Sequence, residues 1–304
     1  MNIGLTLGGV EPVSLNSPVA CVWPLACSLG EGPLWWQNAV WFTDIKQKQV
    51  HRFDPGSGQK QSWRAPSEVG FLAPLKNGRF IAGAKTGLYD FDPATGGFTL
   101  IRTVEPNRPA NRLNDGAVDR SGRLWFGSMD DDEKEPRGML YRFHRGSLAP
   151  MDSGYVITNG PAFSPDGGTL YHTDTLERRI YAFDLREDGS LANKRVFVTI
   201  EPGAGYPDGP VVDSEGCLWT GLFGGWSARR YAPDGRLLER VAFPVANITK
   251  LAFGGPGLAT VYATTARVGL DAAALAGQPE AGGLFCFEAK IPGQPQFCAT
   301  LASE

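Results

Sequence analysis

The sequence lacks the residue clusters that mark several common classes of protein. It has three histidines and five cysteines, and the cysteines form no C-x-x-C pair, so neither a zinc-thiolate site nor a disulfide framework is indicated. We expect the cysteines to be buried thiols in a reducing compartment. Runs of Lys or Arg are also missing and the formal net charge is -3, which argues against nucleic acid as a partner because phosphate binding needs a basic face.

Long apolar segments and nucleotide or nucleophile motifs are missing as well. No apolar run approaches the roughly 20 residues of a membrane span, and the N-terminus has no basic region before a hydrophobic core. We therefore expect a cytoplasmic protein without a secretion signal, a membrane attachment or an obligate protein partner. A G-x-S-x-G elbow, a P-loop and a G-x-G-x-x-G motif are all absent, which excludes the commonest serine hydrolase and nucleotide-binding signatures. Helical periodicity is nearly absent, and only GLDAAALAGQ (residues 269–278) could form a short helix.

What the sequence does contain is a repeat of short β-rich units. Each unit has an apolar segment, a polar turn with Gly, an aromatic-containing strand and a further strand, and the units recur at intervals of about 40 to 50 residues. They begin at Glu31, Phe71, Asn114, Asn159, Asp208 and Ile248. Turns such as Asn77-Gly78, Ser121-Gly122 and Asp166-Gly167 supply the positive-φ residues of tight hairpins.

This repeat predicts an all-β fold, a six-bladed β-propeller with four-stranded antiparallel blades around a central channel. A β-sandwich, the main alternative, would not show a unit repeat of this size. We expect a single domain over residues 1–304, with residues 1–16 as a loosely ordered N-terminal extension. Residues 19–30 are expected to pair with the last blade and close the ring.

Three units begin with the same frame, an oxygen-bearing side chain followed by Gly-Pro: Glu31 in EGP, Asn159 in NGP and Asp208 in DGP. Asp115 occupies the equivalent place in a fourth unit. In a propeller the innermost strands run alongside the channel, so these side chains should face one another across the axis. The Gly gives backbone freedom and the Pro stiffens the start of the strand.

Two carboxylates and a carboxamide that converge on one point repel each other unless a cation lies between them. Asp-Gly and Asn-Gly pairs are often simple turns, but the other such pairs in this chain follow the first strand of a unit and do not precede it. Hard oxygen donors suit an oxygen-seeking divalent ion. We therefore predict that Glu31, Asn159 and Asp208 bind one divalent cation, with Ca²⁺ in first place and Mn²⁺, Mg²⁺, Zn²⁺ or Fe²⁺ as alternatives. His172, next to a carboxylate in YHTD, is retained as a possible site residue, although a wall or core position is the alternative.

Several motifs together resemble the SMP-30/gluconolactonase/regucalcin family. The motifs are LGEGPLW, NRLNDGAVDRSGRLWFGSM, ITNGPAFSPDG and YPDGPVVDSEGCLW, and the resemblance runs from about Cys21 to about Phe287. It implies a six-bladed propeller, one divalent cation at the channel mouth and hydrolysis of sugar lactones.

The resemblance also assigns roles to individual residues. Glu31, Asn159 and Asp208 match the family's metal ligands, and Asp208 also matches its proposed general base. Arg112 and Asn114 match substrate-contacting positions. Asp132 falls where family members often carry a sugar-binding glutamate, but its side chain is one methylene shorter. Residues 130–138 are a candidate lid, with a solvated surface loop as the alternative.

The function expected from these residues is metal-dependent hydrolysis of an aldono-1,4- or 1,5-lactone in sugar catabolism. Arabinono-, xylono- and gluconolactone are the candidate substrates. Two alternatives remain open: a non-enzymic calcium-binding regulatory propeller, and a related propeller hydrolase of apolar lactones or phosphotriesters.

Overall fold

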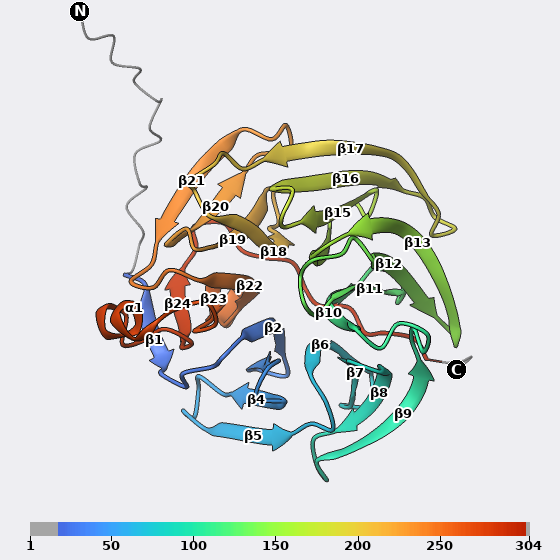
Figure 1. The fold of residues 1–304 in the computed structure, drawn as a ribbon, viewed down its shortest axis with the longest axis horizontal. Helices are drawn as coiled ribbons and strands as arrows, with labels where there is room; N and C mark the ends of the chain where they lie inside the picture. Colours follow the sequence, from blue (N-terminus) through green and yellow to red (C-terminus); the bar gives the residue numbers. More distant parts are fainter. Residues whose placement is uncertain (1–17, 302–304) are drawn as a thin grey trace, which may run out of the picture.

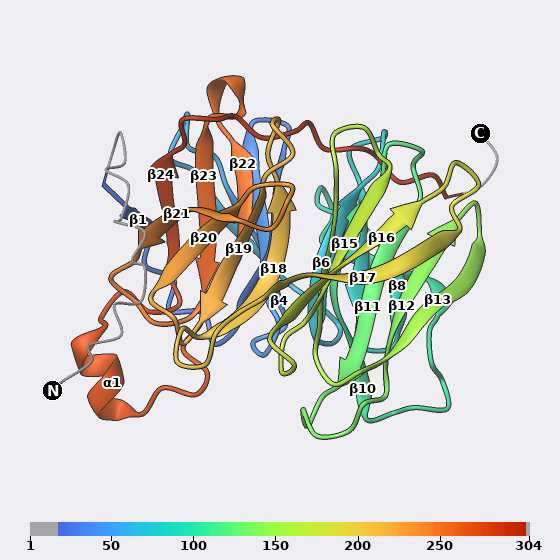
Figure 2. The same cartoon turned by 90° about the horizontal axis from the view of Figure 1, so that it is seen from above.

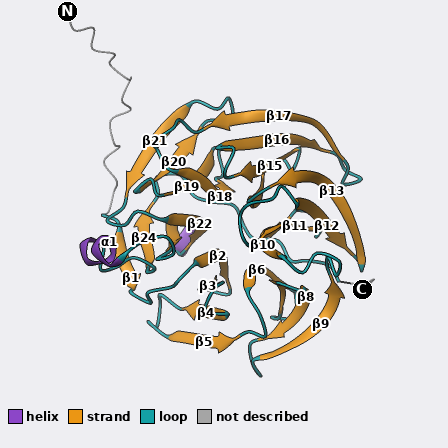
Figure 3. Ribbon diagram, in the orientation of Figure 1, coloured by secondary structure: helices purple, strands orange, loops and turns teal. Residues whose placement is uncertain are grey.

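The computed structural model describes residues 18–301, so the expected extension at residues 1–16 lies outside the described part of the chain. Within the described range the chain forms β-strands, one short α-helix, α1 (Ala272–Gly277), and one 3-10 turn, η1 (Pro256–Leu258) (Figure 3). The helix begins at Asp271, whose side chain accepts a hydrogen bond from the Ala274 backbone N–H. It forms within the GLDAAALAGQ segment, as the sequence predicted. None of the described helices is long and apolar enough to cross a membrane.

Sixteen of the strands form four separate antiparallel sheets of four consecutive strands each. The first is β2 (Gly30–Trp36), β3 (Ala39–Asp44), β4 (Gln49–Phe53) and β5 (Lys60–Arg64). The second is β6 (Val69–Pro74), β7 (Phe80–Ala84), β8 (Gly87–Asp92) and β9 (Gly97–Thr103). The third is β10 (Asn111–Val118), β11 (Leu124–Asp130), β12 (Gly138–His144) and β13 (Ser147–Tyr155). The fourth is β14 (Thr158–Phe163), β15 (Thr169–Asp174), β16 (Arg179–Leu185) and β17 (Leu191–Thr199).

The other eight strands form one sheet in the order β1-β24-β23-β22-β18-β19-β20-β21. They are β1 (Ala20–Trp23), β18 (Tyr206–Val212), β19 (Leu218–Phe223), β20 (Ser227–Tyr231), β21 (Leu237–Ala242), β22 (Ile248–Gly254), β23 (Thr260–Thr265) and β24 (Leu284–Glu288). Its two antiparallel halves meet through a single parallel bridge between Gly209 and Lys250. The sequence predicted six separate sheets, and the structure differs at this bridge.

The sheets are arranged around a common centre, with β2, β6, β10, β14, β18 and β22 innermost (Figure 1). Each of these strands contacts the next one around the ring, and β22 contacts β2. The chain is therefore an all-β propeller built of four-stranded antiparallel blades. The N-terminal strand β1 pairs with β24 at the C-terminal end of the chain, with Ala20 opposite Cys286, which confirms the predicted closure of the ring.

Aromatic side chains fill the space between neighbouring blades. The Trp41 and Phe80 rings, from β3 and β7, lie 4.6 Å apart, and the Phe71 and Phe126 rings, from β6 and β11, lie 5.7 Å apart. All four side chains are buried. Because each aromatic side chain removes about 150–250 Å² from water, these contacts are the main source of blade-to-blade cohesion.

A buried aspartate anchors each of two equivalent hairpins. Asp213 accepts hydrogen bonds from the Cys217 backbone N–H (3.0 Å), the Trp219 indole N–H (3.0 Å) and Arg230 Nε (2.8 Å). Asp119 makes the corresponding bonds in the β10–β11 hairpin. The repeated V-D-x-x-G-x-L-W pattern therefore encodes a side-chain anchor as well as a turn.

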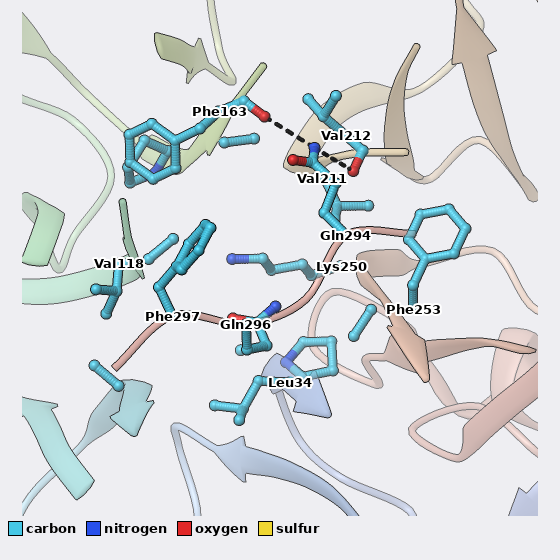
Figure 4. A pocket seen from close by; sticks show the side chains of 18 of the residues that line it. Leu34, Val118, Phe163, Val211, Val212, Lys250, Phe253, Gln294, Gln296 and Phe297 are labelled. Atoms are coloured by element: carbon cyan, nitrogen blue, oxygen red, sulfur yellow. Dashed lines mark hydrogen bonds between the residues drawn. The ribbon is translucent and has the colours of Figure 1, made fainter. Parts of the chain in front are cut away.

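The C-terminal segment, residues 291–301, crosses one end of the channel, on the side of the disc opposite α1 (Figure 2). Gln294 Nε2 donates hydrogen bonds to the backbone carbonyls of Phe163 (3.2 Å) and Val212 (3.1 Å), which belong to two blades. Figure 4 shows the small cavity beneath the segment, about 90 Å³ in volume, with the Lys250 side chain at its centre.

Candidate metal centre

The frame residues lie where the pairing of the innermost strands is irregular. The register shifts directly after Glu31 in β2, directly after Asn159 in β14 and around Asp208 in β18. A bulge of this kind bends the strand and re-aims a side chain. The shifts explain how residues within a β-ladder can direct their side chains toward the channel.

The frame glycines are required by close approach of neighbouring strands. A Cβ on Gly32 would lie 2.7 Å from the Gly70 carbonyl oxygen, and Gly32 also has a φ of +56°. A Cβ on Gly209 would lie 2.6 Å from Lys250 Cγ. Since real Cβ atoms essentially never come this close, only glycine allows the inner strands to pack at these points.

Glu31, Asn159 and Asp208 line one cavity of about 320 Å³, which shares no lining residue with the cavity beneath the C-terminal segment. All three side chains are buried. The lining of the cavity includes the apolar side chains of Leu29, Ile157, Leu176, Phe223 and Val268. The volume is at the small end of the range of about 300–1,000 Å³ that is typical of small-molecule sites.

The Asn159 amide is held in one orientation by two neighbours. Its Nδ2 donates to Thr175 Oγ1 (2.9 Å), and its Oδ1 accepts from Asn114 Nδ2 (3.0 Å). Thr175 also lines the cavity. Arg112, which can only donate, holds Asn114 Oδ1, so Asn114 Nδ2 faces Asn159 and makes Oδ1 the acceptor of that amide. The sequence did not indicate the contact with Thr175, because Thr175 lies in the turn after β15 and outside the repeated frame.

Arg112 and Asn114, the two predicted substrate-contacting residues, line the same cavity and are bonded to each other. Arg112 Nη1 donates to Asn114 Oδ1, and Arg112 Nε donates to Asp131 Oδ1 (2.9 Å). Asn114 Nδ2 also donates to the Thr158 carbonyl (2.6 Å). The Asn114 amide thus makes hydrogen bonds with protein groups on both of its polar atoms, so it positions Arg112 and Asn159.

The two carboxylates of the set are buried side by side. Burial and the charge of Asp115 raise the pKa of Glu31 to about 7, while Lys250 opposes the shift. Burial, together with the charges of Glu31 and Asp115, raises the pKa of Asp208 well above its ordinary value. Both shifts express the cost of placing two negative charges together away from water.

A bound divalent cation fits this donor set. Asp208 Oδ1 is buried without a hydrogen-bond partner, which is costly for a carboxylate oxygen. A cation between Asp208 and Glu31 would supply the missing partner and remove the repulsion. The described residues contain no group of three or more His, Cys, Asp or Glu side chains placed to hold a metal ion; the set here consists of two carboxylates and one amide.

Asp115, the possible fourth member of the set, has a different environment. Its oxygens accept from Lys250 Nζ and from the backbone N–H groups of Gly116 and Gly160 (2.7 Å each). The ion pair with Lys250 is almost fully buried. Asp115 therefore already has a cationic partner and does not line the cavity. The sequence did not indicate its pairing with Lys250.

Two neighbours of Asp132 contribute to the site, whereas Asp132 itself does not. Asp132 is exposed and is not among the cavity-lining residues, whereas Glu133 lines the cavity and Asp131 binds Arg112. The predicted lid at residues 130–138 thus contributes to the wall of the cavity through Glu133. Glu133 has a φ of +58°, so strand alternation could not predict the direction of its side chain.

His172 lies away from the cavity. It is fully buried in β15, its ring packs edge-on against the Tyr155 ring at 4.9 Å, and neither ring nitrogen has a hydrogen-bond partner. Burial lowers its pKa to about 3. Its position is that of a neutral core residue.

Comparison with known proteins places the chain in a family. Residues 29–267 match the family described as "SMP-30/Gluconolactonase/LRE-like region". The chain is 38% identical over 277 residues to L-arabinolactonase of Azospirillum brasilense, covering 88% of this chain and 90% of the relative. It is 32% identical over 283 residues to 6-deoxy-6-sulfogluconolactonase of Pseudomonas putida, covering 92% and 97%.

A solved structure shares the whole architecture. The calcium-binding protein regucalcin from Agrobacterium tumefaciens superimposes with a TM-score of 0.91 at 29% identity, covering 95% of this chain and 100% of that chain.

Proposed function

This chain belongs to the SMP-30/gluconolactonase/LRE-like family, and on that premise we propose that it hydrolyses the lactone of a sugar acid to the free acid. The observation that carries the proposal is the unpartnered Oδ1 of Asp208, buried in the cavity beside Glu31 and Asn159. The names of the two lactonase relatives support the reaction class. A lactone is a cyclic ester whose cleavage needs no covalent nucleophile.

Different residues of the cavity would have different roles in this reaction. Glu31, Asn159 and Asp208 would hold a divalent cation, whose chemistry when bound is Lewis-acid polarisation of a carbonyl oxygen. The Asp208 oxygen that does not hold the cation would accept a proton from the attacking water and return it to the ring oxygen as the acyl C–O bond breaks. Arg112 binds and orients the hydroxyl groups of the substrate from the wall of the cavity.

We propose aldonolactones as the substrate class, with arabinono-, xylono- and gluconolactone as the first compounds to assay. The cavity volume of about 320 Å³ suits a single sugar lactone. Among the divalent ions we favour Ca²⁺, because all the protein donors are hard oxygens. The name of the regucalcin neighbour, a calcium-binding protein, agrees with this choice.

We also infer that the propeller has six blades within a single domain. The eight-stranded sheet has two antiparallel halves of four strands, and only one parallel bridge joins them. Each half begins at an innermost strand of the ring, β18 or β22. Counting each half as one blade gives six, in agreement with the number of repeats in the sequence.

The proposal is tested by a pH-stat assay of the purified protein against a panel of sugar lactones. We expect acid release from at least one aldonolactone, loss of that activity in EDTA and its return on addition of a divalent ion. An enzyme that keeps full activity after exhaustive EDTA treatment would contradict the metal assignment. Binding of Ca²⁺ without hydrolysis of any lactone would favour the regulatory alternative.

A second candidate function is hydrolysis of apolar lactones or phosphotriesters. The observation that favours it is the apolar part of the lining, in which Leu176 and Val268 are 41% and 39% exposed. Arg112 and Glu133, which line the same cavity, favour a polyol. An aliphatic lactone and a phosphotriester in the same assay panel distinguish the two, because the polyol proposal predicts no turnover of either.

A further inference from the structure

Three cationic side chains converge on one carboxylate at the charged wall of the cavity. Asp131 Oδ1 accepts from Lys46 Nζ (2.8 Å) and Arg112 Nε (2.9 Å), and Asp131 Oδ2 accepts from Lys85 Nζ (2.7 Å). We call these four residues the basic cluster. It carries three positive charges and one negative charge. Lys46 and Arg112 line the same cavity as Asp208.

The members of the basic cluster come from three different blades. Lys46 follows β3, Lys85 follows β7, Arg112 lies within β10 and Asp131 follows β11. The ends of these strands meet on the same side of the ring as the candidate metal centre. The fold therefore brings the positive charges together at the cavity, although they are far apart along the chain.

This concentration of like charge is unfavourable unless a second anion is present. One carboxylate neutralises one of the three cations, and the remaining two repel each other across a few ångströms. Each lysine ammonium has three donors, so each has donors beyond its bond to Asp131. The Lys46 and Lys85 side chains are 33% and 28% exposed, so both are accessible to a ligand.

We propose that the basic cluster binds an anionic substituent of the substrate, a carboxylate or sulfonate at the end of the sugar acid remote from the lactone carbonyl. The inference rests on the proposed lactonase function and specifies its substrate class. Glu133 also lines the cavity, and together with the basic cluster it makes a group of three positive and two negative charges. A charged hydrogen bond of this kind is worth more than a bond to a neutral hydroxyl, so the anionic lactone is preferred.

The kinetic test compares two lactones that differ in the remote end. D-glucono-1,4-lactone ends in a neutral hydroxymethyl group, and D-glucaro-1,4-lactone has the same ring and ends in a carboxylate. For the wild-type enzyme we expect kcat/KM for the glucarolactone to exceed that for the gluconolactone by about tenfold or more, the effect of one hydrogen bond to a charged group. A ratio of one or less overturns the inference and leaves the lactonase function intact.

Variants of the basic cluster test whether it causes the preference for the anionic lactone. Lys46→Met and Lys85→Met should each lower kcat/KM for the glucarolactone about tenfold and change that for the gluconolactone less than about threefold. Lys48→Met is the matched control, because Lys48 lies on the same turn but its side chain pairs with Glu68 and not with Asp131. Equal losses on both lactones in the cluster variants would contradict a role in charge recognition.

Binding of open-chain acids separates failure of this inference from failure of the proposed function. By calorimetry glucarate, a dianion, should bind the wild-type protein more tightly than gluconate, and Lys46→Met should remove the difference. This binding pattern would support anion recognition by the basic cluster even if the protein hydrolysed no lactone. Absence of hydrolysis would overturn only the lactonase proposal. Equal affinity for the two acids contradicts the inference.

Discussion

Asp208 and Asp115 are both buried carboxylates at the start of innermost strands, but their surroundings give them different chemistry. Asp115 accepts hydrogen bonds from Lys250 and from two backbone N–H groups, so its charge is balanced. Asp208 has a buried oxygen without a partner and a pKa raised by burial and by Glu31. The difference comes from Lys250, which forms an ion pair with Asp115 and leaves Asp208 free to bind a ligand.

Asp208→Asn keeps the size of the side chain and removes its charge. We expect kcat/KM for the best lactone to fall by about 10²- to 10⁴-fold, the contribution typical of a positioned general base. In EDTA the variant should unfold at a higher temperature than the wild type at pH 8, because the raised pKa of Asp208 means that its charge destabilises the folded state there.

The control for this variant is Asp132→Asn, which changes an exposed carboxylate of the neighbouring loop. It should keep kcat/KM within about twofold and leave the melting temperature unchanged, as is usual for surface substitutions. Near-normal turnover in Asp208→Asn would remove Asp208 from the reaction.

His172 makes stability depend on pH below neutrality. Burial lowers its pKa to about 3, whereas the unfolded chain has a histidine pKa of about 6.5. As the pH falls below about 6.5, the unfolded state binds a proton that the folded state excludes, so stability is lost progressively down to about pH 3. At pH 5 the loss from this residue is about 2 kcal/mol.

His172→Leu removes the titrating group and has a similar volume. Urea denaturation at pH 7 and pH 5 should show that the free energy of unfolding falls about 2 kcal/mol less in the variant than in the wild type. Identical pH dependence in the two proteins would show that the His172 imidazole takes up a proton in the folded state.

At the scale of single elements, each hairpin relies on polar groups inside the blade as well as on its turn. Asp213, at the end of β18, ties the turn, the indole of Trp219 in β19 and Arg230 in β20 together. Its side chain is fully buried and that of Arg230 is 7% exposed. The anchor therefore links three strands of one blade through one carboxylate.

Asp213→Ala should lower the free energy of unfolding by about 2–4 kcal/mol, because it leaves the buried Trp219 indole N–H, the Cys217 backbone N–H and Arg230 Nε without their acceptor. Arg230 keeps its ion pairs with Glu215 and Glu239. Denaturant titration measures the change. Asp234→Ala, in an exposed turn of the same sheet, is the control and should alter stability by less than about 0.5 kcal/mol. A loss of similar size in both variants would contradict the anchoring role of Asp213.

The elements were largely predictable from the sequence, while the charged contacts between them were not. Alternating and aromatic-rich runs predicted the strands, and the repeated frame led to Glu31, Asn159 and Asp208, which line one cavity. The sequence could not show that Asp131 binds Arg112, because side-chain directions in a loop do not follow strand alternation. It also gave no direct sign of the Lys250 partner, which lies in a distant unit; the one available signal was a lysine near the start of the sixth repeat.

At the scale of the whole molecule, the C-terminal segment forms hydrogen bonds with several different blades. Besides the bonds of Gln294, the Ala299 backbone N–H donates to the Pro74 carbonyl (2.8 Å) and that of Thr300 to the Gly122 carbonyl (3.0 Å). These contacts lie at the end of the channel opposite the candidate metal centre. The segment therefore stabilises the ring without forming part of the reactive cavity.

Deletion of residues 291–304 should lower the melting temperature by at least about 5 °C, since several hydrogen bonds of about 1 kcal/mol each are lost together with apolar contacts. Below the melting temperature the lactonase kcat/KM should stay within about twofold. Gln294→Ala, which removes only the side-chain bonds, should give a smaller decrease by calorimetry. If the truncated protein had the same melting temperature as the full-length protein, the segment would not stabilise the ring.

The pairing of β1 with β24 has a consequence for protein synthesis. Among the described strands β1 is translated before all the others, and β24 after them. Trp23 can pack against Phe42 and Phe53 of the first blade early in synthesis, but the edge of β1 that pairs with β24 stays open until β24 has been made. Mispairing of this open β-edge is therefore a hazard specific to the interval before ring closure.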